Sequence, residues 1–134
     1  MKILNVQQIR EADQYTIKNE PIASIDLMER ASREVVNWIC NHFSNDHEII
    51  ILAGSWNNGG DGLAIARLIE NHGYKVRVVL VMGESGSEDF VQNLNKLKSI
   101  HEVEISDDFD FSTSTDKSIL IDAIFGSGLS RPIE

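Results

Sequence analysis

The sequence predicts an α/β fold in which helices cover both faces of a mainly parallel sheet. From residue 48 onward, apolar runs of strand length alternate with segments of helical periodicity, a pattern typical of strand–helix–strand units. Two of these runs lead directly into polar, glycine-rich stretches, Gly54–Gly62 and Asp122–Pro132. In an open parallel sheet, ligands bind beyond the carboxyl ends of the strands, so these stretches are the candidate functional loops.

Two helices are predicted before the first strand. Asn5 followed by Gln8 has the spacing of a capping box, which predicts a helix over residues 6–18. Ser24 is expected to cap a longer helix over about residues 25–43. Apolar residues at helical spacing define the expected inward face of this second helix, which is formed by Met28, Ala31, Val35 and Ile39.

The remaining elements alternate along the chain. In order they are strand 48–53, helix 61–72, strand 76–82, helix 88–98, strand 102–105 and strand 118–122. Gly73 is a natural C-terminal cap for the first of these helices. The third strand is short and edge-like, because Val103 and Ile105 alternate with glutamates. The acidic, Ser/Thr-rich stretch 106–117 is expected to be an exposed loop.

The stretch Gly54–Gly62 reads Gly-Ser-Trp-Asn-Asn-Gly-Gly-Asp-Gly. A glycine-rich turn between strand and helix lets a ligand approach the backbone. It also aims N–H groups and the positive end of the helix dipole at one spot, which suits phosphate. The stretch matches neither the dinucleotide-binding nor the P-loop fingerprint. A tight connection without a ligand is the alternative interpretation.

The two candidate loops are expected to meet. If the strand order is 3-2-1-4, the first strand lies beside the fourth, and the loops that follow them face each other across one crevice. Asp122 would then lie beside Asn57 or Asn58. Carboxylate and amide oxygens are hard ligands that suit an alkali or alkaline-earth cation. A turn cap is the alternative role for Asp122.

Composition excludes several classes of partner. The net charge is −9 and the pI about 4.8, and an acidic surface repels nucleic acid and anionic membranes. Cys40 is the only cysteine, so no internal disulfide can form. The N-terminus lacks the pattern of a signal peptide, and no apolar run approaches the length of a membrane span. The sequence therefore predicts a cytoplasmic protein without nucleic-acid or membrane partners.

Three motifs, in order and at compatible spacing, resemble the YjeF N-terminal domain family of NAD(P)H-hydrate epimerases. They are Leu-Met-Glu-Arg-Ala at 27–31, Asn-Asn-Gly-Gly-Asp-Gly at 57–62 and Asp-Ala-Ile-Phe-Gly-Ser-Gly-Leu-Ser-Arg-Pro at 122–132. The resemblance runs from about Val6 to the last residue and identifies residues 1–134 as one such domain, incomplete at its C-terminal end. It implies a Rossmann-like three-layer αβα sandwich. It also implies an isomerase that interconverts the R and S epimers of hydrated NADH and NADPH, in the repair of nicotinamide cofactors.

The resemblance implies roles for individual residues. Substrate contacts are implied for Asn57, Asn58, Gly59, Gly60 and Asp61. Ligands to a potassium ion are implied at Asn58 and Asp122. The phosphate-bearing part of the substrate is expected to be wrapped by Gly126, Ser127, Gly128, Leu129, Ser130, Arg131 and Pro132. An ATP- or ADP-dependent dehydratase, fused or separate, and a second copy in a homodimer are the partners that the resemblance suggests.

Two features depart from the family pattern. The family usually has Pro-Gly or a similar small pair where this chain has Ser55-Trp56, and the large ring of Trp56 could stack on a ligand ring or simply cover the loop. The family's proposed acid–base Asp belongs to an Asp-x-Pro-Ser-Gly motif, which the sequence up to Glu134 does not contain. The catalytic residue is therefore unassigned, and we expect very low epimerase activity from residues 1–134 alone.

The alternative to an epimerase is a non-catalytic nucleotide-binding or dimerisation module of the same fold. A domain of an mRNA-decapping enhancer is a relative of that kind. A generic flavodoxin-like or receiver domain is a weaker alternative, because neither is expected to carry the Asn-Asn-Gly-Gly-Asp-Gly stretch. The catalytic lineage is favoured by the retention of four polar residues, Asn57, Asn58, Asp61 and Asp122.

Overall fold

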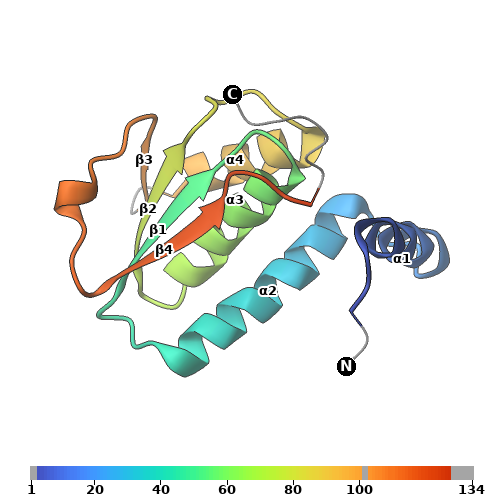
Figure 1. Ribbon diagram of the computed structural model, residues 1–134, viewed down its shortest axis with the longest axis horizontal. Coiled ribbons are helices and arrows are strands. Elements are labelled where there is room, and N and C mark those ends of the chain that lie inside the picture. Colours follow the sequence, from blue (N-terminus) through green and yellow to red (C-terminus); the bar gives the residue numbers. More distant parts are fainter. Residues whose placement is uncertain (1–2, 101–102, 128–134) are drawn as a thin grey trace.

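The computed structural model describes residues 3–100 and 103–127. Its helices are α1 (Val6–Asn19), α2 (Ser24–His42), α3 (Asn57–Glu70) and α4 (Glu88–Lys98). Its strands are β1 (Glu48–Ala53), β2 (Lys75–Leu80), β3 (Glu104–Ser106) and β4 (Ser118–Ala123), with a short 3₁₀ helix at Phe111–Thr113. Strands and helices alternate from β1 to β3, as Figure 1 shows, so the predicted α/β class is confirmed.

The four strands form one parallel sheet in the order β3-β2-β1-β4. Strands β1, β2 and β4 end at the same level of the sheet. Ala53, the last residue of β1, pairs with Leu80, the last of β2, and with Ala123, the last of β4. This is the predicted strand order. The chain steps outward from β1 to β3 and then returns across the sheet to β4. The boundary between β1 and β4 is therefore the switch point of the topology, where open α/β sheets bind ligands.

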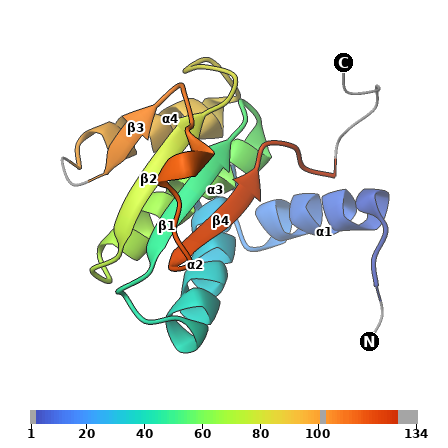
Figure 2. The same ribbon diagram turned by 60° about the vertical axis from the view of Figure 1, so that its left-hand side comes forward.

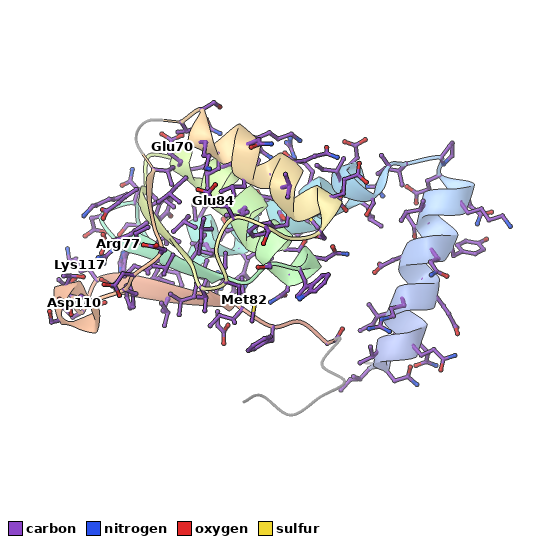
Figure 3. All side chains as sticks on the ribbon, turned by 90° about the horizontal axis from the view of Figure 1, so that it is seen from above. Glu70, Arg77, Met82, Glu84, Asp110 and Lys117 are labelled. Carbon is purple, nitrogen blue, oxygen red and sulfur yellow. The ribbon has the colours of Figure 1, made fainter. Side chains whose placement is uncertain are left out.

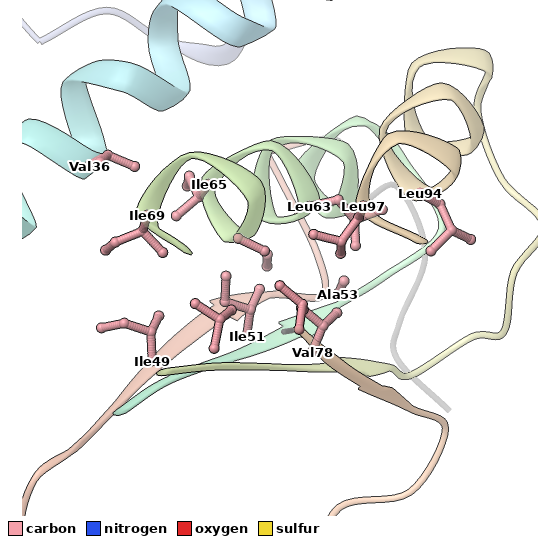
Figure 4. Close-up of a cluster of buried hydrophobic side chains, with 14 of the residues drawn as sticks. Val36, Ile49, Ile51, Ala53, Leu63, Ile65, Ile69, Val78, Leu94 and Leu97 are labelled. Carbon is pink, nitrogen blue, oxygen red and sulfur yellow. The ribbon is translucent and has the colours of Figure 1, made fainter. Parts of the chain in front are cut away.

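The core lies between the sheet and α3, as Figure 4 shows. Successive side chains of a strand point to opposite faces of the sheet, so every second residue of β1 packs against α3. The buried cluster is completed by residues of α2 and α4 on either side of α3 and includes Val36, Ile49, Ile51, Leu63, Ile69, Val78, Leu94 and Leu97. Burial of aliphatic side chains, at about 25 cal/mol per Å², is the main force that holds these layers together.

The described helices α2, α3 and α4 all lie over one face of the sheet (Figures 1, 2 and 4). The connection from β3 to β4 is attached to the opposite face through Arg77 of β2. Its Nη1 donates to Thr113 Oγ1 at 2.6 Å, and its guanidinium lies 5.4 Å from the ring centre of Phe109. The predicted helical layer on this face is not formed by the described residues, because this connection holds only the short 3₁₀ helix.

The inward face of α2 differs from the predicted one. Met28 and Ile39 are buried as expected, but Val35 is exposed and Ser32 and Val36 are buried instead. Ser32 lies in this face because its small side chain lets α3 approach, and its Oγ donates to the main-chain oxygen of Asp61 at 3.4 Å. Position 31, which was also predicted to face inward, is exposed.

The start of α2 also differs from the prediction. The N-cap residue is Ala23, which has no capping side chain, and Ser24 is the first residue of the helix. The hydroxyl of Ser24 donates instead to Asp89 Oδ2 at 2.7 Å, which ties α2 to the first turn of α4. Tertiary contact thus replaces the local capping bond that the sequence suggested.

Helix α1 extends away from the rest of the fold, as Figure 2 shows, and buries none of its residues. Its predicted capping box is confirmed: Asn5 Oδ1 accepts from the Gln8 N–H at 2.9 Å, and Gln8 Oε1 accepts from the Asn5 N–H at 3.0 Å. Within the described ranges, no helix combines the length and apolarity that crossing a bilayer requires.

Candidate functional site

The predicted meeting of two loops occurs at the carboxyl ends of β1 and β4. The N–H of Gly54 donates to the carbonyl oxygen of Ala123 at 3.1 Å. A Cβ atom at Gly54 would lie 2.1 Å from the carbonyl oxygen of Ile124, closer than any side chain permits. Glycine is therefore required here because two backbones touch.

The glycine-rich stretch after β1 is the first part of a helix and not an extended loop. Helix α3 begins at Asn57, four residues before the predicted start at residue 61. A Cβ atom at Gly59 would lie 1.6 Å from the carbonyl oxygen of Gly54, and one at Gly62 would lie 2.7 Å from the Cβ of Ala123. The glycines let the helix pack directly onto the ends of two strands, and this packing offsets their poor helix propensity.

The N-terminus of α3 lies at this junction and is not capped by a side chain. Trp56 is the N-cap residue, and it makes no side-chain hydrogen bond to the first turn. The first N–H groups of a helix have no partner within the helix, and the helix dipole adds partial positive charge there. Asn57 is exposed and Asn58 half-buried in this turn. The arrangement suits a negatively charged group such as a phosphate.

The second loop reaches the side chain of Asn58. A Cβ atom at Gly126 would lie 3.2 Å from Asn58 Cβ and 3.7 Å from Asn58 Oδ1. The structure therefore brings together one residue from the motif at 57–62 and one from the motif at 122–132. Gly126 and Ser127 are exposed. The other residues predicted to wrap the phosphate lie outside the described residues, and they are Gly128, Leu129, Ser130, Arg131 and Pro132.

Asp122 lies in β4 opposite Leu52 of β1 and is exposed. Its Oδ1 accepts a hydrogen bond from the N–H of Ile124 at 3.0 Å, which is the turn-capping role considered as the alternative. The capping bond uses one carboxylate oxygen and leaves the other for a ligand. In the part of the chain that the structure describes, no three His, Cys, Asp or Glu side chains are grouped as a metal site would require.

Asp61 lies in the second turn of α3, in a partly buried position. Burial raises the pKa of its carboxyl group to about 6, and repulsion by the carboxylates of Asp13 and Asp89 adds to the increase. Asp13 belongs to α1 and Asp89 to the start of α4, so three distant segments create this environment.

The loop that follows β2 also meets this junction, although it was not predicted to belong to the site. The carbonyl oxygen of Ser55 accepts from the Ser87 N–H at 2.9 Å, and Ser55 Oγ donates to the carbonyl oxygen of Met82 at 3.4 Å. A Cβ atom at Gly86 would lie 2.0 Å from Ser55 O. The signal that could have revealed this contact is the glycine-rich turn Gly83–Ser87, which follows the strand next to β1.

The other end of the helical layer contains an open cavity of about 620 Å³. It lies between α2 and the C-terminal ends of α3 and α4, away from the glycine-rich junction. Its lining is mostly charged and consists of Asp26, Glu29, Arg33, Arg67, Asn71, Lys96, Ser99 and Ile100. Glu29 contacts both Arg33 and Arg67 there, so its carboxylate is already paired within the cavity. It holds none of the predicted site residues.

Comparison with known proteins places these motifs in a family. Residues 24–134 match the family described as YjeF-related protein N-terminus. The NAD(P)H-hydrate epimerase of Limosilactobacillus fermentum is 36% identical over 131 residues, which are 98% of this chain and 62% of that protein. The NAD(P)H-hydrate epimerase of Lentilactobacillus buchneri is 39% identical over 134 residues, which are 97% of this chain and 60% of that protein.

The fold has a counterpart among solved structures. The crystal structure of yeast ynu0, YNL200c, matches it with a TM-score of 0.83 and 25% sequence identity, over 100% of this chain and 60% of that one. The chain thus spans about 60% of the length of the relatives it matches. The family match covers both strands of the switch point and all three loops that meet there. The chain belongs to the YjeF-related protein N-terminus family.

Proposed function

We propose that this protein is an NAD(P)H-hydrate epimerase, an isomerase that interconverts the R and S epimers of hydrated NADH and NADPH. The observation that carries the proposal is the contact between Asn58 and Gly126, which joins the two family motifs at the switch point of the sheet. Relatives named NAD(P)H-hydrate epimerase support it. The retained polar residues Asn57, Asn58, Asp61 and Asp122 favour an enzyme over a non-catalytic module of the same fold.

Different site residues would bind different parts of the substrate. The uncapped N-terminus of α3 would hold the pyrophosphate, with the amide side chains of Asn57 and Asn58 orienting the rest of the substrate. The backbone of Gly126 and Ser127 would close the opposite side. Asp61, in the second turn of α3, would add a carboxyl group to the substrate contacts.

Potassium is the cation we propose for the site. The donor chemistry fits, because the amide oxygen of Asn58 and the carboxylate of Asp122 are hard oxygen ligands. Asp122 has one oxygen that the turn-capping bond to Ile124 does not use. A bound cation would supply positive charge beside the anionic substrate, and Asp122 and Asn58 would hold it.

The test of the proposed substrate class is direct binding. Hydrated NADPH and intact NADPH should each be titrated into the chain by calorimetry, with the Gly126→Val variant as a control that fills the junction beside Asn58. We expect saturable binding by the unmodified chain and weaker binding by the variant. Failure of the folded, unmodified chain to bind either nucleotide would overturn the proposal.

Catalysis is tested by mixing the chain with the R epimer of hydrated NADH and a separate S-specific dehydratase. The rate at which NADH is recovered is then measured. We expect recovery well below that given by the Limosilactobacillus fermentum relative, because the family's acid–base motif is absent from residues 1–134 and positioned acid–base groups contribute about 10²–10⁴-fold. Recovery at the relative's rate would mean that the base lies within residues 1–134.

The proposal also includes a dehydratase as partner, a homodimer and a cytoplasmic location.

A further inference from the structure

Large apolar side chains gather around the glycine-rich junction and remain exposed. Trp56 is 67% exposed, Met82 45% and Phe125 36%. These residues follow β1, β2 and β4 respectively, so each of the three loops that meet at the candidate site contributes one. Figure 3 shows Met82 away from the end of the sheet that carries Asp110 and Lys117. An exposed apolar cluster beside a polar site is typical of a surface that binds a ligand.

Hydrogen bonds fix the backbone next to Trp56, whereas the Trp56 side chain is exposed. Ser55, the preceding residue, is hydrogen-bonded to both Met82 and Ser87, and Trp56 itself is the N-cap residue of α3. Among the described residues, the Trp56 ring makes no ring contact and its side chain no hydrogen bond. Trp38 is also exposed, but it stacks on His42 with ring centres 4.3 Å apart. Trp56 therefore presents a positioned aromatic surface that stacks on no ring among the described residues.

We propose that Trp56 is the surface on which the adenine base of the nucleotide substrate stacks, with Phe125 and Met82 bordering the same subsite. This inference rests on the proposed function. Stacking needs two flat aromatic faces, and adenine offers one. The hydrated nicotinamide ring is less suitable, because hydration removes a ring double bond and puckers the ring. A phosphate bound at the N-terminus of α3 would place the attached nucleoside next to Trp56.

The experiment compares ADP-ribose, which carries adenine, with nicotinamide mononucleotide and ribose 5-phosphate, which do not. Calorimetry measures all three affinities in the unmodified chain and in the Trp56→Ala, Trp56→Phe and Trp38→Ala variants. Trp56→Ala should weaken ADP-ribose binding by about 5- to 100-fold, since base–aromatic stacking contributes about 1–3 kcal/mol. It should leave ribose 5-phosphate unchanged. Trp56→Phe should restore most of the affinity, and Trp38→Ala should match the unmodified chain.

Fluorescence gives a second readout. In the Trp38→Phe variant, Trp56 is the only tryptophan, and ADP-ribose should quench its emission at saturating concentration while ribose 5-phosphate should not. Equal ADP-ribose affinity in the Trp56→Ala variant would overturn the stacking proposal alone. A selective loss of nicotinamide mononucleotide binding would overturn the assignment to adenine. If the unmodified chain binds none of the three ligands, the proposed function fails and the subsite with it.

Discussion

Single glycines determine how closely α3 approaches the strands. A Cβ atom at Gly59 would meet the rigid backbone oxygen of Gly54, whereas one at Gly60 would meet the flexible end of Met28 at 3.1 Å. Both residues lie in the first turn of α3, so both changes to alanine gain the same helix propensity, about 1 kcal/mol. The two glycines thus form a matched pair that differs only in what surrounds them.

We expect Gly59→Ala to lower the free energy of unfolding by more than about 3 kcal/mol, because a backbone must move to admit the methyl group. Gly60→Ala should change it by less than about 1 kcal/mol, since Met28 can change rotamer. Urea titrations of both variants measure the difference. Similar losses in the two variants would show that glycine is needed at these positions for another reason.

Asp61 should make stability depend on pH. Its pKa is raised in the folded state from 3.8 to about 6, so the folded protein binds more protons than the unfolded chain between these values. Stability from this group therefore falls as pH rises from about 4 to 6 and stays reduced above. The loss is up to about 3 kcal/mol, at about 1.4 kcal/mol per pKa unit.

The Asp61→Asn variant removes this charge. We expect it to be more stable than the unmodified chain at pH 8 and about equally stable at pH 4, with denaturant titrations at both values as the measurement. Asp13→Asn should give a smaller change in the same direction, because it removes one of the two repelling carboxylates. A stability difference that does not vary with pH would refute this account of Asp61.

The site could be predicted from sequence only where strand order determines it. The contact between Asn58 and Gly126 follows from adjacent β1 and β4, and the apolar runs made that adjacency predictable. The raised pKa of Asp61 was not predictable, because the burial of its carboxyl group and its nearness to Asp13 and Asp89 arise only in the folded chain. No local sequence pattern predicts which residues from distant segments will lie close together.

At the scale of elements, well-capped helices contribute very differently to stability. Helices α1 and α4 both begin at a capping side chain, Asn5 and Ser87. Helix α4 buries Phe90 and Leu94, among others, whereas α1 buries none of its residues. A cap stabilises its own helix by about 0.5–2 kcal/mol. That energy affects global unfolding only if the helix melts together with the core.

Asn5→Ala should therefore speed hydrogen exchange of the first α1 amides without moving the urea midpoint of global unfolding. Ser87→Ala is the control, because it removes a cap of similar type from α4 and should lower that midpoint. Hydrogen exchange followed by mass spectrometry measures the local effect, and fluorescence the global one. An equal shift of the midpoint in both variants would mean that α1 unfolds together with the core.

Helix positions were predicted better than helix faces and starts. Periodicity located α2 within one residue at each end, but it chose Val35 over Val36 and missed Ser32. Both valines are apolar, and the choice between them depends on where α3 lies. The start of α3 was missed because Asn-Asn-Gly-Gly has poor helix propensity, and only the packing of Gly59 and Gly62 on the strand ends makes a helix favourable there.

At the scale of the whole molecule, a net charge of −9 works against folding. The described ion pairs relieve part of this repulsion at the amino ends of the strands, where Glu48 contacts both Lys75 and Arg77. Near the other end of the sheet, the carboxylates of Asp13 and Asp89 repel that of Asp61. Any salt should therefore stabilise the fold by screening this repulsion, and a specifically bound cation should add to that effect.

Potassium chloride and sodium chloride at equal concentration separate the two contributions. Both salts screen equally, but an ion that binds only the folded state adds RT ln(1 + [ion]/Kd), about 1.4 kcal/mol at ten times its Kd. If the Asn58 and Asp122 oxygens select potassium, the thermal midpoint should be higher in potassium chloride.

Asp122→Ala should abolish that difference and keep the rise common to both salts, because the variant loses a cation ligand and its turn cap but hardly changes the overall charge. Asp107→Ala, which removes an equal charge from an exposed position outside the junction, should keep the difference. Equal midpoints of the unmodified chain in the two salts, across the whole concentration range, would reject a potassium site formed by this chain.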